Sequence, residues 1–202
     1  MNDFYQRDIV LENKHVKLVP FHASYEEGLK QLLFDREITA FTGEHFTNDQ
    51  DVKNYIGRTL NGRTANESYP FIVIDKSSGQ AAGSTSFGNI RMNQKRLEIG
   101  WTWYGKAFRG TYVNKAAKFE LLKFVFEEMG FNRVQFSVDA ENIRSQKAVL
   151  KLGAKQEGIF RCNYVNASGE CRDDIYFSII KSEWPELART VFSDYLHHSA
   201  NS

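Results

Sequence analysis

The chain has 202 residues, of which 42% are hydrophobic and 14% aromatic; this suits one packed domain and excludes a disordered chain. Its 26 Lys and Arg residues balance 25 Asp and Glu, so the net charge of +1 gives no reason to expect nucleic acid or an anionic membrane as a partner. No apolar run approaches the roughly 20 residues of a membrane span, and the first ten residues lack the apolar core of a secretory signal. We therefore expect a cytoplasmic protein.

The first half of the chain predicts helices and strands from the spacing of its apolar residues. In chain order we expect a strand at 14–19, a helix at 23–34, an irregular segment at 35–48, a helix at 49–61 behind Asn48 or Asp49 as cap, and strands at 70–75, 80–90 and 94–103.

The strand at 94–103 has the clearest alternation in the chain. Apolar and polar positions alternate along it, which is typical of a strand with one buried face. The expected apolar face carries Leu97, Ile99, Trp101 and Trp103, and the opposite face carries Glu98, Gly100 and Thr102.

The second half predicts three helices, a strand and a hairpin. The expected elements are a helix at 111–129, a strand at 133–139, a helix at 143–151 behind Asn142, hairpin strands at 156–165 and 171–180, and a last helix at 182–196 with Pro185 in its first turn. This order predicts a mixed sheet with helices on its faces, within one domain spanning residues 1–202.

The two cysteines, Cys162 and Cys171, flank the turn of the expected hairpin. Two cysteines are too few for a disulfide framework, and no histidines or cysteines have the spacing of a zinc site. For a cytosolic protein we expect free thiols, with a bond across the hairpin as the alternative. We expect no metal.

Two motifs resemble those of the GNAT acetyltransferase superfamily, and most of all its RimJ/RimL-type branch of ribosomal-protein N-terminal acetyltransferases. The first is RGTYVN at 109–114, similar to the acyl-CoA motif Arg/Gln-x-x-Gly-x-Gly/Ala. The second extends from Asn142 and Ser145 to Gly153 and Gly158. The resemblance covers about residues 12–185 and implies an α/β (mixed α+β) GNAT fold, with a mostly antiparallel sheet of six to seven strands.

The resemblance also implies acetyl-CoA as co-substrate. Backbone amides at a helix N-terminus would bind its pyrophosphate, since unpaired N–H groups and the helix dipole both favour an anion. The strand ending at Trp103 would pair with the pantetheine arm and supply a backbone oxyanion donor. The implied cofactor-binding residues are Trp101, Thr102, Trp103, Arg109, Gly110, Thr111, Tyr112, Val113, Asn114 and Asn142.

The hexapeptide departs from the family motif at two positions. Tyr112 and Asn114 stand where the motif has glycine and glycine or alanine. Asn114 could cap the helix that begins there. The tyrosine ring must turn away from the turn, either along the helix or over the cofactor, so we expect Tyr112→Gly to keep or improve affinity for CoA.

The resemblance implies direct attack of an amine on the acetyl group in a ternary complex. Glu98 is the implied base and Ser145 the implied acid for the leaving thiolate, with solvated side chains as the alternative for both. Tyr164 or Tyr176 could serve as the acid instead, although packing explains these tyrosines as well. Arg144, Arg161 and Arg172 could bind cofactor phosphates or an acidic substrate, or simply be solvated.

The segments 35–48 and 163–170 are expected to select the acceptor. Asp35, Glu37 and Glu44 in the first segment could hold an ammonium group. The expected acceptor is the N-terminal amine of a protein or peptide. The alternatives are a small amine, such as an aminoglycoside or polyamine, and a non-catalytic module that binds acyl-CoA; a homodimer is left open.

Overall fold

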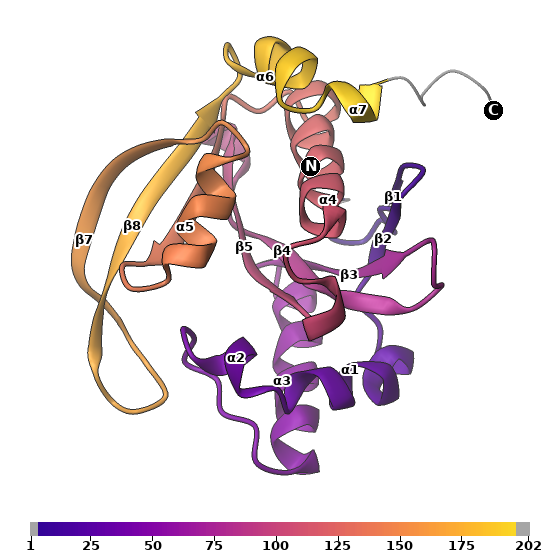
Figure 1. Cartoon of the computed structure of the whole chain (residues 1–202), viewed down its shortest axis with the longest axis vertical. Coiled ribbons are helices and arrows are strands. Elements are labelled where there is room, and N and C mark those ends of the chain that lie inside the picture. Colours follow the sequence, from indigo (N-terminus) through magenta and orange to yellow (C-terminus); the bar gives the residue numbers. More distant parts are fainter. Residues whose placement is uncertain (1–3, 197–202) are drawn as a thin grey trace.

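The computed structural model describes residues 4–196 and shows an eight-stranded sheet with helices on both faces (Figure 1). The strands are β1 (Leu11–Glu12), β2 (Val16–Pro20), β3 (Tyr69–Asp75), β4 (Ala81–Arg91), β5 (Arg96–Tyr104), β6 (Arg133–Asp139), β7 (Lys155–Val165) and β8 (Cys171–Ile180). The helices are α1 (Glu26–Leu33), α2 (Arg36–Thr39), α3 (Asp49–Thr64), α4 (Tyr112–Lys123), α5 (Ile143–Leu150), α6 (Trp184–Thr190) and α7 (Ser193–Leu196).

The strand order across the sheet is β1-β2-β3-β4-β5-β6-β8-β7. Every neighbouring pair is antiparallel except β5 and β6, which are parallel and are joined through α4. The sequence predicts six to seven strands, and the additional one is β1, whose Leu11 pairs with Leu18 of β2. A two-residue strand is too short to show alternation, so no sequence pattern predicts it.

The helices divide between the two faces of the sheet. Helices α4, α5, α6 and α7 lie on the face that holds the main core, to which they contribute the buried residues Phe119, Val149, Trp184 and Tyr195. Helices α1, α2 and α3 cover part of the other face with a smaller core that includes Leu29 and Ile56. No helix within residues 4–196 is both long and apolar enough to cross a bilayer.

Most predicted elements are confirmed, and the structure differs from the prediction in three helical segments. Within the segment 35–48 the chain forms α2, because the Asp35 side chain accepts a hydrogen bond from the Glu37 N–H and caps it. The expected helix at 182–196 is divided into α6 and α7, on either side of the fully buried Phe192. The helix at 111–129 is α4 followed by a π-helical turn, Phe124–Glu128.

Strand β5 contains a bulge that the alternation pattern does not show. Ser86 of β4 pairs with Gly100, and Ser84 pairs with Trp103, so β5 has one residue more than β4 between these two pairs. Trp101 lies within this interval and has a positive φ of 50°. From here on, the side chains of β5 point to the opposite face from the one that simple alternation predicts.

The bulge corrects the expected faces of β5. Leu97 and Ile99 are buried in the main core, as predicted. Trp101 is instead 56% exposed, and Trp103 packs on the α3 side, where its Nε1–H donates to the Tyr55 hydroxyl at 2.9 Å. The prediction that both tryptophans share the face of Leu97 is therefore wrong.

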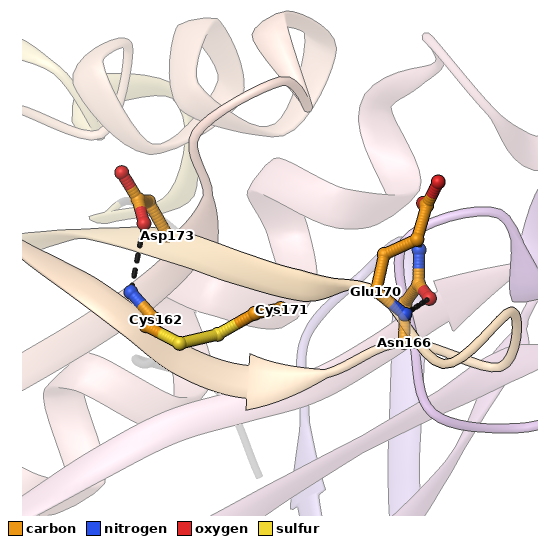
Figure 2. The surroundings of a disulfide bond; sticks show 5 residues. All are labelled: Cys162, Asn166, Glu170, Cys171 and Asp173. Atoms are coloured by element: carbon orange, nitrogen blue, oxygen red, sulfur yellow. Dashed lines mark hydrogen bonds between the residues drawn. A yellow bond between two sulfur atoms is a disulfide. The ribbon is translucent and has the colours of Figure 1, made fainter.

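The prediction of free thiols is also wrong, because Cys162 and Cys171 form a disulfide across the β7–β8 hairpin (Figure 2). The pairing of β7 with β8 shifts between Phe160 and Tyr164, and Cys162 in this interval has a φ of 54°. Its N–H donates to Asp173 Oδ1 at 2.7 Å, which fixes the shifted backbone. The Cα atoms lie 5.0 Å apart, within the usual range for a disulfide.

Candidate active site

The parallel strands β5 and β6 form a fork in the sheet. They pair only from Arg96–Arg133 to Glu98–Gln135 and then separate, while each keeps its antiparallel neighbour on the other side. Past Glu98 and Gln135, the two strand edges that face each other are not paired, so their backbone N–H and C=O groups are open to a ligand. Ligands in sheets with parallel strands bind at the carboxyl ends of those strands, where such openings occur. We refer to this opening as the fork.

Glu98 lies at the point where the fork opens. Its side chain is buried, with only 6% exposure, and points to the face opposite Leu97. Two neutral amides hold it: Asn89 Nδ2 and Gln135 Nε2 donate to the same oxygen, Oε2, at 2.9 and 2.8 Å. The second oxygen, Oε1, is left to accept a further proton or water, and no cation pairs with Glu98 within the described residues.

The next residue of β6 on the face of Gln135 is also polar. Ser137 lies two positions after Gln135 and pairs with Tyr176 of β8. Its hydroxyl is buried and has no hydrogen-bond partner within the described part of the chain. A buried polar atom without a partner is rare in folded proteins and indicates a group that a ligand or water satisfies.

The turn between β5 and α4 places backbone amides beside the fork. Gly110 has a positive φ of 73°, and Thr111 is the N-cap of α4, accepting a hydrogen bond from the Val113 N–H at 3.3 Å. Thr111, and not Asn114, is therefore the cap. Within the described residues the N–H groups of Gly110, Thr111 and Tyr112 have no partner, as expected for the first turn of a helix.

The Tyr112 ring turns away from these amides. Its hydroxyl donates to Asp75 Oδ1 at 2.6 Å, at the β3–β4 turn, and lies 3.2 Å from the Ser77 hydroxyl. Burial acts to raise the pKa of Asp75, but hydrogen bonds from Tyr112, Ser78 and Ser77 hold it below its usual value. The tyrosine thus ties the start of α4 to the β3–β4 turn.

The side chain of Arg109, the first residue of the hexapeptide, is bound within the protein. It is paired with Asp35 and Glu37 at 2.7 Å each, and its Nε–H donates to the Tyr104 carbonyl at 2.7 Å. Glu37 also contacts Arg144 at the start of α5, at 3.1 Å. The backbone N–H of Arg109 is likewise used, donating to the Lys106 carbonyl.

The three acids expected to hold an ammonium group are thus already paired. Asp35 and Glu37 contact Arg109, and Glu44 contacts Arg58 of α3. Hydrogen bonds hold the pKa of Asp35 and that of Glu37 below their usual values, chiefly from the Glu37 N–H in the first case and from Arg144 in the second. Asp35 and Glu37 are therefore ionised, and arginines balance the charge of both.

The start of α5 closes the other side of the fork. Asn142 is its N-cap, as predicted, and its Oδ1 accepts from the Ser145 N–H at 3.0 Å. A pocket of about 350 Å³ lies between α2 and this helix start, lined by Glu37, Ala40, Phe41, Glu141, Asn142, Ile143 and Arg144. Ser145 is half-buried, and its hydroxyl makes no hydrogen bond within the described residues.

Of the two tyrosines considered as acids, Tyr164 already uses its hydroxyl proton in a hydrogen bond within the protein. Its hydroxyl donates to Asp139 Oδ2 at 2.6 Å, and Arg172 also binds both oxygens of Asp139 at 3.0 Å. Burial and the neighbouring Asp139 raise the pKa of Tyr164, which makes it a poorer proton donor. Tyr176 stacks on Phe160, with ring centroids 4.2 Å apart, which is the packing role expected of it.

The segments expected to select the acceptor lie side by side. A side chain at Gly43 would lie 3.6 Å from the Val165 carbonyl, so the α2–α3 loop contacts the tip of the β7–β8 hairpin. Near the fork, the Trp101 ring covers Gly88, where an added Cβ would lie only 2.2 Å from the ring. An exposed tryptophan, a buried carboxylate and an open strand edge thus adjoin one another.

Together these features fit a thioester ligand with an extended arm and a phosphate end. The open strand edges can pair with an amide-bearing arm, and the first-turn amides of α4 suit an anion. The orphaned hydroxyl of Ser137 gives the fork a buried polar group that still requires a partner.

Most of the chain matches known proteins. The family described as "Acetyltransferase (GNAT) domain" matches residues 15–155, so the chain belongs to the GNAT acetyltransferases and is an acyltransferase. "Uncharacterized N-acetyltransferase YnaD" of Bacillus subtilis is 26% identical over 86% of this chain and 98% of its own length.

Two further proteins sharpen the comparison. "Putative ribosomal N-acetyltransferase YdaF" of B. subtilis is 34% identical over 52% of this chain and 57% of its own length. The crystal structure of a GCN5-related N-acetyltransferase from Brucella melitensis matches with a TM-score of 0.85 and 25% identity, over 93% of this chain and 85% of that one. The chain is an N-acetyltransferase, and the resemblance to the ribosomal branch stands.

Sequence reasoning missed the residues that support the site. Asn89 and Gln135 hold Glu98, and Ser137 lies in the fork. The alternation of β6 places Gln135 and Ser137 on one polar face and could have identified both. Nothing local indicates that Asn89, nine residues from Glu98 in the sequence, returns to contact it.

Proposed function

We propose that the protein transfers the acetyl group of acetyl-CoA to the N-terminal amine of a protein or peptide. Membership of the GNAT family supports the donor, and the ribosomal N-acetyltransferase name of YdaF supports the acceptor. The observation that carries the choice of acceptor is the pairing of Asp35, Glu37 and Glu44 with arginines. A polycationic amine would need an excess of acidic charge at the opening, and here that charge is already neutralised.

In the proposed reaction, acetyl-CoA supplies an acetyl thioester lying in the fork. The amine approaches from the face that carries Glu98, forms the new C–N bond, and loses a proton to Glu98 Oε1 directly or through water. Backbone N–H groups near Trp101–Trp103 stabilise the charge on the acetyl oxygen, and the C–S bond breaks. Ser145 gives a proton to the departing sulfur, directly or through water, and regains a proton from solvent, so that CoA leaves as the thiol; the family resemblance implies this role.

The energetics agree with a single carboxylate as base. An α-amino group has a pKa of about 7.7–8.0, so roughly a tenth is neutral at pH 7, a penalty near 1.4 kcal/mol. A lysine amine with a pKa of about 10.4 would carry a penalty of about 4.6 kcal/mol. Glu98 is buried and held by two neutral amides, and we infer that it suits removal of a proton from an α-amino group better than from a lysine amine.

An acceptor comparison tests the proposal. One peptide with a free N-terminus and no lysine, its N-formylated counterpart with one lysine, spermidine and kanamycin would each be incubated with acetyl-CoA, following thiol release and the mass of the acceptor. Acetylation of the free N-terminus, with little of the others, is the expected result. Turnover confined to spermidine or kanamycin would overturn the acceptor. Thermal stabilisation by CoA without any turnover would point to a binding module instead.

A further inference from the structure

A buried lysine lies directly beneath the bulge of β5. Lys118 of α4 is only 4% exposed. Within the described residues no carboxylate pairs with it; its Nζ donates instead to Thr85 Oγ1 at 3.0 Å and to Thr102 Oγ1 at 2.7 Å. A cation this deeply buried without an anion is uncommon, because taking a charge out of water is costly.

The two threonines connect Lys118 to the bulge itself. The Thr85 and Thr102 hydroxyls lie 2.8 Å apart, and the Thr102 hydroxyl also donates to the Gly100 carbonyl at 3.2 Å. Thr85 lies between Ser84 and Ser86, opposite the interval of β5 that contains the extra residue. The hydrogen bonds therefore span the bulge from the residue before Trp101 to the residue after it.

The lysine sets the direction of these hydrogen bonds. Lys118 Nζ donates to both hydroxyls, so each hydroxyl turns its own proton elsewhere. The Gly100 carbonyl is an acceptor for both, at 3.2 Å from the Thr102 hydroxyl and 3.5 Å from the Thr85 hydroxyl. That carbonyl lies on one side of Trp101, a residue held at a positive φ of 50°, which a residue with a side chain rarely adopts. Burial lowers the pKa of Lys118 to about 7, so the arrangement is costly.

We propose that Lys118 is a positioning residue for acetyl transfer: through Thr85 and Thr102 it holds the bulge of β5, and with it the backbone N–H groups of Trp101–Trp103, in the orientation that the reaction needs. The inference rests on the proposed function, because those N–H groups matter only where an acetyl thioester lies in the fork. Lys118 touches no reacting atom and acts through the backbone.

The position of the bulge supports this role. It lies just past the last paired residues of the fork, Glu98 and Gln135, where β5 leaves β6. A strand without the bulge would pair regularly with β4 and aim different backbone groups at the opening. A displacement of about 1 Å in a catalytic site can cost about a hundredfold in rate, so a device that fixes this backbone has a kinetic consequence.

The test compares Lys118→Met with Glu120→Gln, a matched control. Glu120 lies two residues further on the same helix, is also buried, and contacts Asn13 instead of the bulge. We expect Lys118→Met to lower kcat by about ten- to a hundredfold with little change in KM for acetyl-CoA, and without loss of thermal stability. Glu120→Gln should leave kcat within about twofold.

A second variant separates positioning from general damage. Thr102→Val removes the hydroxyl through which Lys118 acts, so it should lower kcat by a similar factor. The double variant Lys118→Met/Thr102→Val should be no slower than the slower single variant. Multiplied losses in the double variant would show that the two residues act independently and would overturn the inference.

A crystal structure of Lys118→Met gives a readout that needs no acceptor. The expected result is a changed backbone at Gly100–Thr102, with Trp101 leaving its positive φ. An unchanged bulge, or a kcat equal to that of the original protein, would overturn the positioning role. If the unaltered protein acetylates none of the acceptors, the proposed function fails, and the crystal structure still decides whether Lys118 holds the bulge.

Discussion

At the scale of single residues, the site depends on side chains that hold other groups in place. Glu98 owes its orientation to Asn89 and Gln135, and the start of α4 owes its anchorage to Tyr112. The Gln135–Glu98 and Tyr112–Asp75 contacts each join residues 37 positions apart, whereas Asn89 is nine positions from Glu98. Substitutions that change one functional group and keep the size of the side chain are the informative ones, because they separate the chemical role of a residue from its packing.

Glu98→Gln tests how much base catalysis the acceptor needs. The amide oxygen of glutamine can replace Oε2 and keep both hydrogen bonds, so the change removes the charge and little else. If the acceptor is an N-terminal amine, kcat near pH 8 should fall only modestly, by about tenfold or less, because much of the amine is already neutral. A loss of about a thousandfold at pH 8, in steady-state assays, would contradict this and indicate a more basic amine.

Tyr112→Phe tests whether the ring belongs to the cofactor site. The variant loses the hydrogen bond to Asp75, for which we expect a stability loss of about 1 kcal/mol, measured by chemical denaturation. Since the ring points away from the first-turn amides, calorimetry should show an affinity for CoA within about twofold of the original. The sequence leads us to expect that Tyr112→Gly keeps or improves this affinity. The structure adds that this variant would also lose the hydrogen bond to Asp75. A loss of more than tenfold in affinity in the phenylalanine variant would place the hydroxyl in the site.

At the scale of elements, α2 forms a bridge of charges across the opening of the fork. Glu37 contacts Arg109 on one side and Arg144 on the other. Glu37 and Arg144 line the pocket beside α5, and Arg109 lies in the turn before α4; an anionic cofactor bound there, as proposed, would add further negative charge. The balance of these charges should therefore influence the affinity for CoA.

Glu37→Gln should strengthen CoA binding at low salt. The change removes a negative charge near the turn and leaves Arg109 its contact with Asp35. Because Glu37 is largely exposed, we expect a gain of only a few fold in affinity, lost at about 1 M salt, where charges are screened within about 3 Å. Glu44→Gln, whose partner is Arg58, is the control and should show no gain. Weaker binding by the Glu37 variant would mean that the bridge helps to build the pocket.

The helices and strands also show how much of the fold and of the site could be predicted from the sequence. The strands from β3 to β8 and the cap of α5 follow from alternation and capping residues, because these signals are local. The bulge at Trp101 does not, since the extra residue is defined only by pairing with β4. The pairing of Asp35 and Glu37 with Arg109 joins residues more than 70 positions apart and reverses the role expected for these acids.

At the scale of the whole molecule, Lys118 links stability to pH. Its pKa is lowered by burial from 10.5 to about 7, so the unfolded chain binds this proton more tightly than the folded protein does. The cost is complete below about pH 7 and disappears as the pH rises toward 10.5. Lys118→Met should therefore be more stable than the original protein at pH 6–7, by a few kcal/mol at most, because two hydrogen bonds are lost. Denaturation should show this advantage shrinking between pH 7 and pH 10; a constant or growing difference would contradict it.

The central claim is that the fork between β5 and β6 is the site of acetyl-CoA. Hydrogen exchange of backbone amides, measured with and without saturating acetyl-CoA, tests it most directly. The claim predicts slower exchange in three segments, 99–104 of β5, 136–139 of β6 and 110–114 at the start of α4, with β1–β3 unchanged. Protection that misses the first two segments, in protein shown to be saturated, would contradict it.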